Sequence, residues 1–295
     1  MLEFHTLDVF TATPYTGNPL AVVLGADALT TVQMQTIARE FNLSETIFVM
    51  APADPDHTAR VRIFFPTAEI PFAGHPTIGC AIHLACAAHQ GDFTYTVTLE
   101  EEAGLVPVTV IRQGTDIMAE LTAPVVPFSV VASVDTALVA AALGLAPGDI
   151  GPLPPGVFQG GPRFLYVPVR SLGALAEACP MQPDWSQLMA QAGVDSAYLY
   201  TAGTDCDFRA RMFSPTAGIP EDPATGSATA ILAAHLHQNG AVTDGTTRLA
   251  LRQGVEMGRA SDLTLTIDAA GGAITAVRIA GSAVAISQDH LRPPL

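Results

Sequence analysis

Glu45, His75 and Asp222 are the side chains of this chain best suited to proton transfer. Glu45 lies in the otherwise apolar, strand-like segment 43–50, where burial would raise the pKa of its carboxyl toward the neutral range that acid–base catalysis at carbon requires. The segment alone favours a simpler interpretation, an outward-facing residue on a half-exposed strand. For His75 or Asp222 alone, a turn contact or a helix cap is likewise the simpler interpretation.

An internal duplication changes this balance. Residues 62–71 and 211–220 are identical at seven of ten positions, and after a two-residue slip the alignment lays His75 over Asp222. This symmetric placement favours a functional role for both side chains. A repeat 149 residues apart in a chain of 295 residues predicts two equivalent halves rather than a solenoid.

Each copy of the repeat predicts a strand, a tight turn and a helix start. Pro76 and Pro223 suit the first helical position, which puts the residue before each proline at a cap position. No Asp, Glu, Lys or Arg occurs at 70–90 or 223–243, so both helices are expected to be buried on every side. If both helices enter one interface, their N-termini face a common cleft that suits a carboxylate or an enolate-like intermediate.

The two halves differ at the position of Glu45. Aligning Leu43 with Val194 puts Ser196 opposite Glu45, so only one half supplies a carboxylate there. A racemase with two bases needs acids on opposite faces of its substrate. A single base therefore favours a proton that moves along one face.

The amino-acid composition excludes several kinds of cofactor chemistry. All thirteen basic residues are arginine, which excludes Schiff-base and pyridoxal phosphate chemistry and a Walker-type phosphate loop. There is no dinucleotide fingerprint, and the cysteines show no metal or disulfide spacing; they are Cys80, Cys86, Cys179 and Cys206. We therefore expect activity without a metal or an organic cofactor.

The net charge of −15 argues against nucleic acid and anionic membrane surfaces, which leaves a small molecule as the expected ligand. Residues 1–5 show no basic or apolar part of a signal peptide. The apolar run 77–88 is short against the roughly 20 residues of a membrane span, so no membrane segment is expected. A reducing cytoplasm fits the free cysteines best.

The predicted fold class is α+β. We expect two pseudo-symmetric domains, 1–124 and 125–295, joined near 123–127, with the last strand able to cross back to the first half. Each domain is expected to be a mixed sheet or barrel wrapped around a central apolar helix. Strands are predicted at 2–10, 20–24, 43–50, 93–99, 104–112, 116–121, 163–169 and 194–200, helices at 30–41, 135–144 and 185–192, and a loop at 151–156.

Six short motifs together resemble the phenazine-biosynthesis PhzF-like isomerase family. They are Asp8-Val9-Phe10-Thr11, Gly17-Asn18-Pro19-Leu20-Ala21-Val22, Asn42-Leu43-Ser44-Glu45-Thr46, Phe72-Ala73-Gly74-His75-Pro76-Thr77, Glu221-Asp222-Pro223-Ala224-Thr225-Gly226-Ser227 and Gln253-Gly254-Val255-Glu256-Met257-Gly258-Arg259. The resemblance implies a diaminopimelate-epimerase-like fold with the active site between two halves. Family members are commonly homodimers, so a homodimer is expected.

The resemblance also implies residue roles. Glu45 would be the single acid/base, His75 and Asp222 would bind and orient the substrate, and Asn18 would contact it. Amides near the remaining motif residues would hold its acidic group, namely Gly74, Gly226 and Ser227. The implied reaction shifts a proton and a double bond in a small acidic substrate similar to dihydro-hydroxyanthranilate.

Two alternatives remain open from sequence. One is an epimerase or racemase of a small amino or hydroxy acid without catalytic thiols. The amino-acid epimerases of this fold place a cysteine at each helix start, where this chain has Ala73 and Pro223. The other is a ligand-binding or interaction protein of the same fold without turnover.

Overall fold

The computed structural model describes residues 1–295 apart from the side chain of Ala217. The chain forms two compact units, residues 1–122 with 280–295 (unit 1) and residues 123–279 (unit 2). The last segment of the chain thus belongs with the first. The expected linker 123–127 begins where unit 2 begins.

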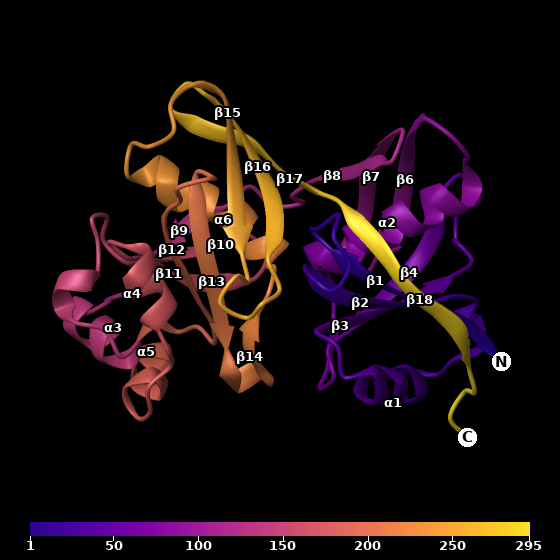
Figure 1. Cartoon of the computed structure of the whole chain (residues 1–295), viewed down its shortest axis with the longest axis horizontal. Coiled ribbons are helices and arrows are strands. Elements are labelled where there is room, and N and C mark those ends of the chain that lie inside the picture. Colours follow the sequence, from indigo (N-terminus) through magenta and orange to yellow (C-terminus); the bar gives the residue numbers. More distant parts are fainter. The chain divides into compact units, whose positions relative to one another are not determined.

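Unit 1 contains the first strands of the chain, the first repeat and the last strand (Figure 1). Its elements are β1 (Leu2–Val9), β2 (Asn18–Val23), α1 (Thr31–Phe41), β3 (Glu45–Met50), β4 (Ala59–Phe64), β5 (Glu69–Ile70), α2 (Gly74–Ala88), β6 (Phe93–Glu101), β7 (Gly104–Gln113), β8 (Asp116–Thr122) and β18 (Ala283–Leu291), with a 3-10 turn at Ala26–Ala28. The strands and the helix predicted in this half are confirmed to within a few residues.

The sheet of unit 1 runs in the order β18–β1–β2–β3–β4–β6–β7–β8, with β5 added to β4. The pairs β2–β3 and β4–β6 are parallel and the others antiparallel. The sheet curls around α2, which contacts strands along most of its length. Gly79 permits the close approach, because a Cβ there would lie 2.6 Å from Leu20 Cδ2 and 2.7 Å from Val9 Cγ2.

Unit 2 contains the second repeat. Its elements are β9 (Phe128–Val130), α3 (Thr136–Ala142), β10 (Gly156–Gln159), β11 (Arg163–Pro168), α4 (Leu172–Glu177), α5 (Asp184–Ala192), β12 (Ala197–Ala202), β13 (Phe208–Ser214), β14 (Ile219–Asp222), α6 (Gly226–Gln238), β15 (Gly245–Gln253), β16 (Ser261–Ala270) and β17 (Ala273–Gly281), with 3-10 turns at Pro147–Asp149 and Pro215–Ala217. Strands β9 and β10 and helix α4 were not predicted.

The sheet of unit 2 repeats the pairing scheme of unit 1. Its order is β9–β10–β11–β12–β13–β15–β16, with parallel pairs β11–β12 and β13–β15 and with β14 added to β13. β17 lies beside β16, where Arg278 pairs with Asp268. This sheet packs on α6, while α3, α4 and α5 form a second core with the sheet, centred on the fully buried Trp185. A mixed sheet around an apolar helix in each unit confirms the predicted fold class.

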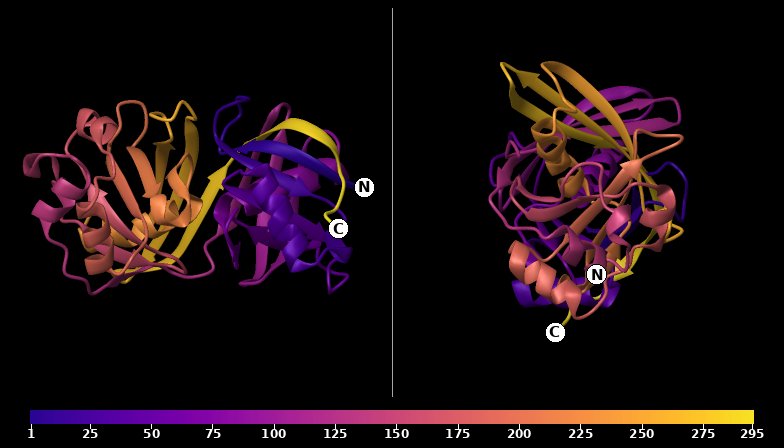
Figure 2. Two further views of the ribbon diagram at one scale, coloured as in Figure 1. Left: turned by 90° about the horizontal axis from the view of Figure 1, so that it is seen from below. Right: turned by 90° about the vertical axis from the view of Figure 1, so that its left-hand side faces the viewer.

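The first and last strands of the chain are neighbours. β18 runs antiparallel to β1 from Leu2 opposite Leu291 to Val9 opposite Ala283, so both termini belong to unit 1 (Figure 2). No helix among the described residues has the length and apolar character that spanning a bilayer requires.

Candidate active site

Glu45 is the first residue of β3, and its side chain is buried. β3 lies between β2 and β4, with Leu20 opposite Glu45, and both α1 and α2 contact it. Every residue of the strand is consequently buried, Glu45 at 7% exposure. The outward-facing interpretation of this residue was therefore wrong, because two helices cover the strand.

His75 lies beside Glu45. Its Nδ1 is 3.2 Å from Glu45 Oε2, and the imidazole is 3% exposed. Burial lowers the pKa of His75 to about 3, opposed in part by the nearby Pro19 carbonyl. The imidazole is therefore neutral at physiological pH, and Glu45 has a dipolar neighbour in His75 rather than a counter-ion.

The helices begin elsewhere than the prolines predicted. α2 starts at Gly74 with Ala73 as its N-cap, so His75 lies inside the first turn, where Pro76 is tolerated because its missing N–H has no helical partner. α6 starts at Gly226 with Thr225 as its N-cap. Neither His75 nor Asp222 is a cap residue.

Asp222 ends β14, which explains its distance from the start of α6. It pairs with Met212 in the β13–β14 ladder, and this holds it in an extended conformation. The Thr225 hydroxyl donates to Asp222 Oδ2 at 2.5 Å, and Gln253 Nε2 donates to the Asp222 carbonyl at 2.8 Å. The Asp222 side chain is buried at 6% exposure.

Gln253 was not identified as a site residue from the sequence, although it opens one of the six motifs. Its amide side chain joins β15 to the segment before α6, because Oε1 accepts from Thr225 N–H at 3.2 Å while Nε2 donates to Asp222. The following residue, Gly254, has φ +74°, and a Cβ there would lie 2.6 Å from the Pro223 carbonyl oxygen. A glutamine directly before a glycine, at the start of a motif, is the sequence signal that could have indicated this contact.

Each unit holds the segment before its central helix with an arginine–glutamate pair, which we call the Arg–Glu clamps. In unit 1, Arg62 donates twice to Glu69, with both distances 2.6 Å. In unit 2, Arg211 donates to Glu221 at 2.7 and 2.8 Å. Each clamp ties β4 or β13 to the short strand that leads toward α2 or α6.

The clamps correct the internal alignment. The two arginines are 149 positions apart, but the two glutamates and the two helix starts are 152 positions apart, so the second copy contains three more residues. By this register His75 corresponds to Ser227, and Asp222 corresponds to Ile70. The symmetric relation inferred between His75 and Asp222 was therefore wrong.

The predicted counterpart of Glu45 is confirmed. Thr46 lies opposite Phe64 in unit 1 and Ala197 lies opposite Phe213 in unit 2, which makes Ser196 the equivalent of Glu45. The Ser196 hydroxyl donates to the Ser214 hydroxyl at 2.7 Å. Only unit 1 therefore has a carboxylate at this position.

Of the other predicted binding residues, Gly74, Gly226 and Ser227 lie close to His75 or Asp222 along the chain, whereas Asn18 lies two residues before Leu20, the partner of Glu45 in the β2–β3 ladder. Asn18 is fully buried as the first residue of β2, directly before Pro19. Gly74 and Gly226 are the buried first residues of α2 and α6, and Ser227 is half-buried. Neither helix has a side-chain N-cap, whereas Thr30, Asp135 and Ser171 cap α1, α3 and α4.

The structure thus brings Glu45 and His75 together in unit 1, and Asp222 lies near the start of α6 in unit 2. Uncapped helix starts carry backbone N–H groups and a positive dipole end, which suit an anionic ligand. The expectation that both helix starts serve one cleft stays a prediction.

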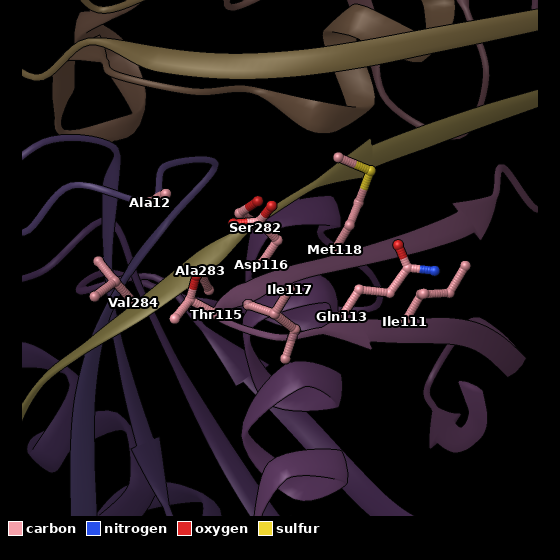
Figure 3. Close-up of a pocket in the computed structure, with 10 residues that line it drawn as sticks. All are labelled: Ala12, Ile111, Gln113, Thr115, Asp116, Ile117, Met118, Ser282, Ala283 and Val284. Carbon is pink, nitrogen blue, oxygen red and sulfur yellow. The ribbon is translucent and has the colours of Figure 1, made fainter. Parts of the chain in front are cut away.

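Unit 1 also has a surface hollow of about 520 Å³ away from these residues (Figure 3). It is formed by β7, β8, the turn between them, the start of β18 and Ala12. Its lining contains one carboxylate, that of Asp116, and includes neither Glu45 nor His75. The hollow therefore does not belong to the candidate site.

Comparison with known proteins agrees with this picture. The chain is 41% identical over 292 residues to an uncharacterized isomerase of Mesorhizobium japonicum, covering 96% of both chains. It is 37% identical to trans-2,3-dihydro-3-hydroxyanthranilate isomerase of Pseudomonas aeruginosa, covering 98% of this chain and 99% of the relative. A solved structure described as a predicted epimerase from the same organism superimposes with a TM-score of 0.82 at 31% identity, over 99% of each chain.

The six motifs extend from residue 8 to residue 259. The sequence model of phenazine biosynthesis-like proteins matches residues 7–289, a range that contains all six. Full-length identity above 30% to relatives and a shared fold lead to the same assignment. The chain belongs to the phenazine biosynthesis-like family, PhzC–PhzF.

Proposed function

We propose that this protein is a cofactor-independent isomerase that shifts a proton, and with it a double bond, in a small acidic substrate similar to dihydro-hydroxyanthranilate. The observation that carries the proposal is the buried Glu45 carboxylate beside a neutral His75, 3.2 Å away. The relatives named as dihydro-hydroxyanthranilate isomerases support the substrate class.

In the proposed reaction Glu45 removes a proton from one carbon of the substrate and returns it to another carbon on the same face. No atom is gained or lost, and the double bond moves as the proton does. A single base is sufficient for this step, and Ser196 in the equivalent position of unit 2 could not act as a second carboxylate. His75 orients the substrate as a neutral group.

The acidic group of the substrate would be held by backbone amides at the helix starts. Gly74 and Gly226 bring no side chain that would block access to these amides, and the helix dipole favours an anion there. Asp222, Asn18 and Ser227 are proposed to contact the rest of the substrate.

The test is proton exchange with solvent, followed by NMR or mass spectrometry. Wild-type protein is incubated in heavy water with trans-2,3-dihydro-3-hydroxyanthranilate and with a panel of small cyclic and amino acids. We expect enzyme-dependent isomerisation of the first compound or of a close analogue. A panel without any exchange, measured on folded protein, would refute the proposal.

Glu45→Gln tests the role of the base. The change keeps shape but cannot accept a proton, and general acid–base catalysis contributes roughly 10²- to 10⁴-fold in rate, so turnover should fall at least a hundredfold. Binding of an acidic ligand should survive because the helix-start amides are untouched. Ser196→Ala, at the equivalent position of unit 2, is the matched control and should retain turnover. Wild-type turnover in Glu45→Gln would assign the proton transfer to another group.

The epimerase alternative is supported by the description of the solved structure at 31% identity. It differs in outcome, because an epimerase inverts one carbon while the double bonds stay in place. Chiral chromatography of the exchanged product distinguishes the two reactions. Inversion without a change in the ultraviolet absorbance of the ring would favour the epimerase.

A further inference from the structure

A buried carboxyl group outside the proposed chemistry lies against the helix that carries His75. Glu101 is the last residue of β6, and its side chain is 8% exposed. Its Oε1 lies 2.6 Å from the hydroxyl oxygen of Thr77, in the first turns of α2. Oε2 is buried and has no hydrogen-bond partner among the described residues.

The Thr77 hydroxyl makes two close contacts but has only one proton. Its oxygen is 2.7 Å from the Ala73 carbonyl and 2.6 Å from Glu101 Oε1. The carbonyl can only accept a hydrogen bond. When the hydroxyl donates to Ala73, the contact with Glu101 needs a second proton, and Glu101 must supply it as a neutral carboxylic acid.

The other proton arrangement, in which Glu101 is ionised, is unfavourable both for the Thr77–Ala73 contact and for Glu101 itself. If Glu101 were ionised, the hydroxyl would donate to it, and two oxygen atoms 2.7 Å apart at Thr77 and Ala73 would have no proton between them. The ionised form would also place a buried charge with no ion-pair partner among the described residues. A neutral acid leaves only its carbonyl oxygen unbonded.

The electrostatic surroundings agree with a neutral acid. Burial raises the pKa of Glu101 to about 8, which the hydrogen bond from Thr77 only partly opposes. From α2 the titratable neighbour is the buried Cys80 thiol, whose pKa is also raised by burial and by Glu101. On its own strand and turn, Glu100 is bonded to His57, and Glu102 acts on Arg62.

The turn between β6 and β7 touches the start of α2 a second time, because Ala103 N–H donates to the Pro71 carbonyl at 3.0 Å. Glu101 thus lies where one turn of the sheet holds the segment 71–77. That segment contains Gly74 and His75.

We propose that Glu101 is a positioning residue, held as a neutral carboxylic acid, whose proton fixes the first turn of α2 and with it His75. The link to catalysis rests on the proposed isomerase function. Loss of the proton in alkaline solution turns the Thr77 hydroxyl toward the carboxylate, and the Ala73 carbonyl keeps only the long hydrogen bond from the Thr77 N–H, at 3.4 Å. The turn that presents His75 beside Glu45 is then held less firmly.

The protonation state is tested without any activity. Full-length protein with ¹³C-labelled glutamate carboxyl groups is titrated by NMR, and the Glu101 signal is identified by its absence from Glu101→Gln. We expect the Glu101 carboxyl group to titrate with a midpoint near pH 8. Above that pH, hydrogen exchange of the amides in the first turn of α2 should increase more steeply than amide exchange ordinarily does with pH. A midpoint near the ordinary value of about 4.3 would overturn the proposal.

Turnover tests the link to His75. Wild-type kcat should decline above pH 8, whereas Glu101→Gln should retain activity at neutral pH and lose this decline, because its amide still donates to Thr77. Glu102→Gln is the matched control, since it removes the charge of an exposed neighbour and should keep the wild-type profile. An unchanged alkaline decline in Glu101→Gln would overturn the positioning role.

The isomerase proposal and the Glu101 proposal can be refuted independently of each other. If no substrate is turned over, the isomerase proposal fails, and the NMR titration and amide exchange still decide the state and effect of Glu101. If Glu101→Gln does not fold, the Glu101 carboxyl signal of the wild-type spectrum is identified as the one that moves in the spectrum of Thr77→Val. A titration near pH 8 without any change in first-turn exchange would also refute the positioning role.

Discussion

The charge of the His75 imidazole determines how readily the neighbouring Glu45 carboxylate accepts a proton. If His75 were charged, it would form an ion pair with Glu45 and stabilise the carboxylate against accepting a proton. Burial prevents this by lowering the pKa of His75 to about 3. In the proposed reaction Glu45 would then accept a proton without first breaking an ion pair with His75.

The same burial predicts a pH dependence of stability. Between pH 6.5 and about 3 the unfolded chain takes up a proton at His75 that the folded chain does not, so the free energy of unfolding falls as the pH is lowered through this window. The contribution is at most about 5 kcal/mol, from 1.36 kcal/mol for each unit of pKa difference.

Urea unfolding at several pH values checks this prediction. His75→Asn should flatten the dependence between pH 6.5 and 3. His290→Asn, at an exposed position, is the control and should follow the wild type. Equal slopes in wild type and His75→Asn would mean that His75 takes up its proton in the folded state as well.

Residue types were predictable from the sequence, but their environments were not. Glu45 was a candidate base from its carboxyl type and its apolar neighbours, and the family resemblance favoured it, yet its burial depends on α1 and α2 covering β3, which are contacts between distant parts of the chain. Glu101 gave no comparable signal, and Gln253 gave only its place at the start of one of the six motifs. Their importance follows from hydrogen bonds to Thr77 and Asp222, which only the folded chain brings within reach.

At the scale of elements, the two Arg–Glu clamps should differ in strength. Arg211 is 8% exposed, and besides Glu221 it donates to the carbonyls of Leu175, Ala176 and Ala178 at the end of α4. In the other clamp about a quarter of each side chain of Arg62 and Glu69 is exposed, so solvent weakens that pair.

Replacing each arginine by alanine tests this difference by urea unfolding. Arg211→Ala should lower the free energy of unfolding by about 3–5 kcal/mol, because Glu221 and three carbonyls lose their partner. Arg62→Ala should lower it by about 1 kcal/mol. Equal losses would show that the α4 carbonyls add nothing to the second clamp.

The packing of α2 on its sheet gives a second prediction at this scale. Gly79→Ala should destabilise the protein by about 1–3 kcal/mol, because the new methyl group would overlap Leu20 and Val9. Gly173→Ala, in α4, is the control. Its Cβ meets only Ser171 Oγ at 3.7 Å, so the higher helix propensity of alanine should stabilise the protein slightly. Thermal unfolding of both variants measures these changes. A Gly79→Ala variant more stable than the wild type would contradict the close packing of α2 on its sheet.

Long elements were predicted well because their hydrophobic period extends over many residues, as in β1, α1 and β7. The four-residue β10 and six-residue α4 are too short to show a period. The register of the repeat could not be read past the repeated prolines. Three additional residues in the second copy are visible only from the glutamates that pair with Arg62 and Arg211.

For the whole molecule, we expect a homodimer, as is common in the family. Sedimentation velocity should give twice the chain mass of 30.7 kDa at micromolar concentration. The control is a dilution series. A specific dimer either persists on dilution or dissociates to single chains, and species larger than the dimer do not form. A mass of 30.7 kDa at all concentrations would contradict the expectation.

The pairing of β18 with β1 has a consequence for synthesis on the ribosome. β1 is made before every other element of the two units, whereas its partner strand, residues 283–291, is made after all of them. Unit 2, which is continuous in sequence, can therefore be complete while unit 1 still lacks an edge strand. During that interval the backbone of β1 is open to other strands, a recognised route to aggregation. A ribosome that stalls before Ala283 would release a chain with one finished unit and one open sheet.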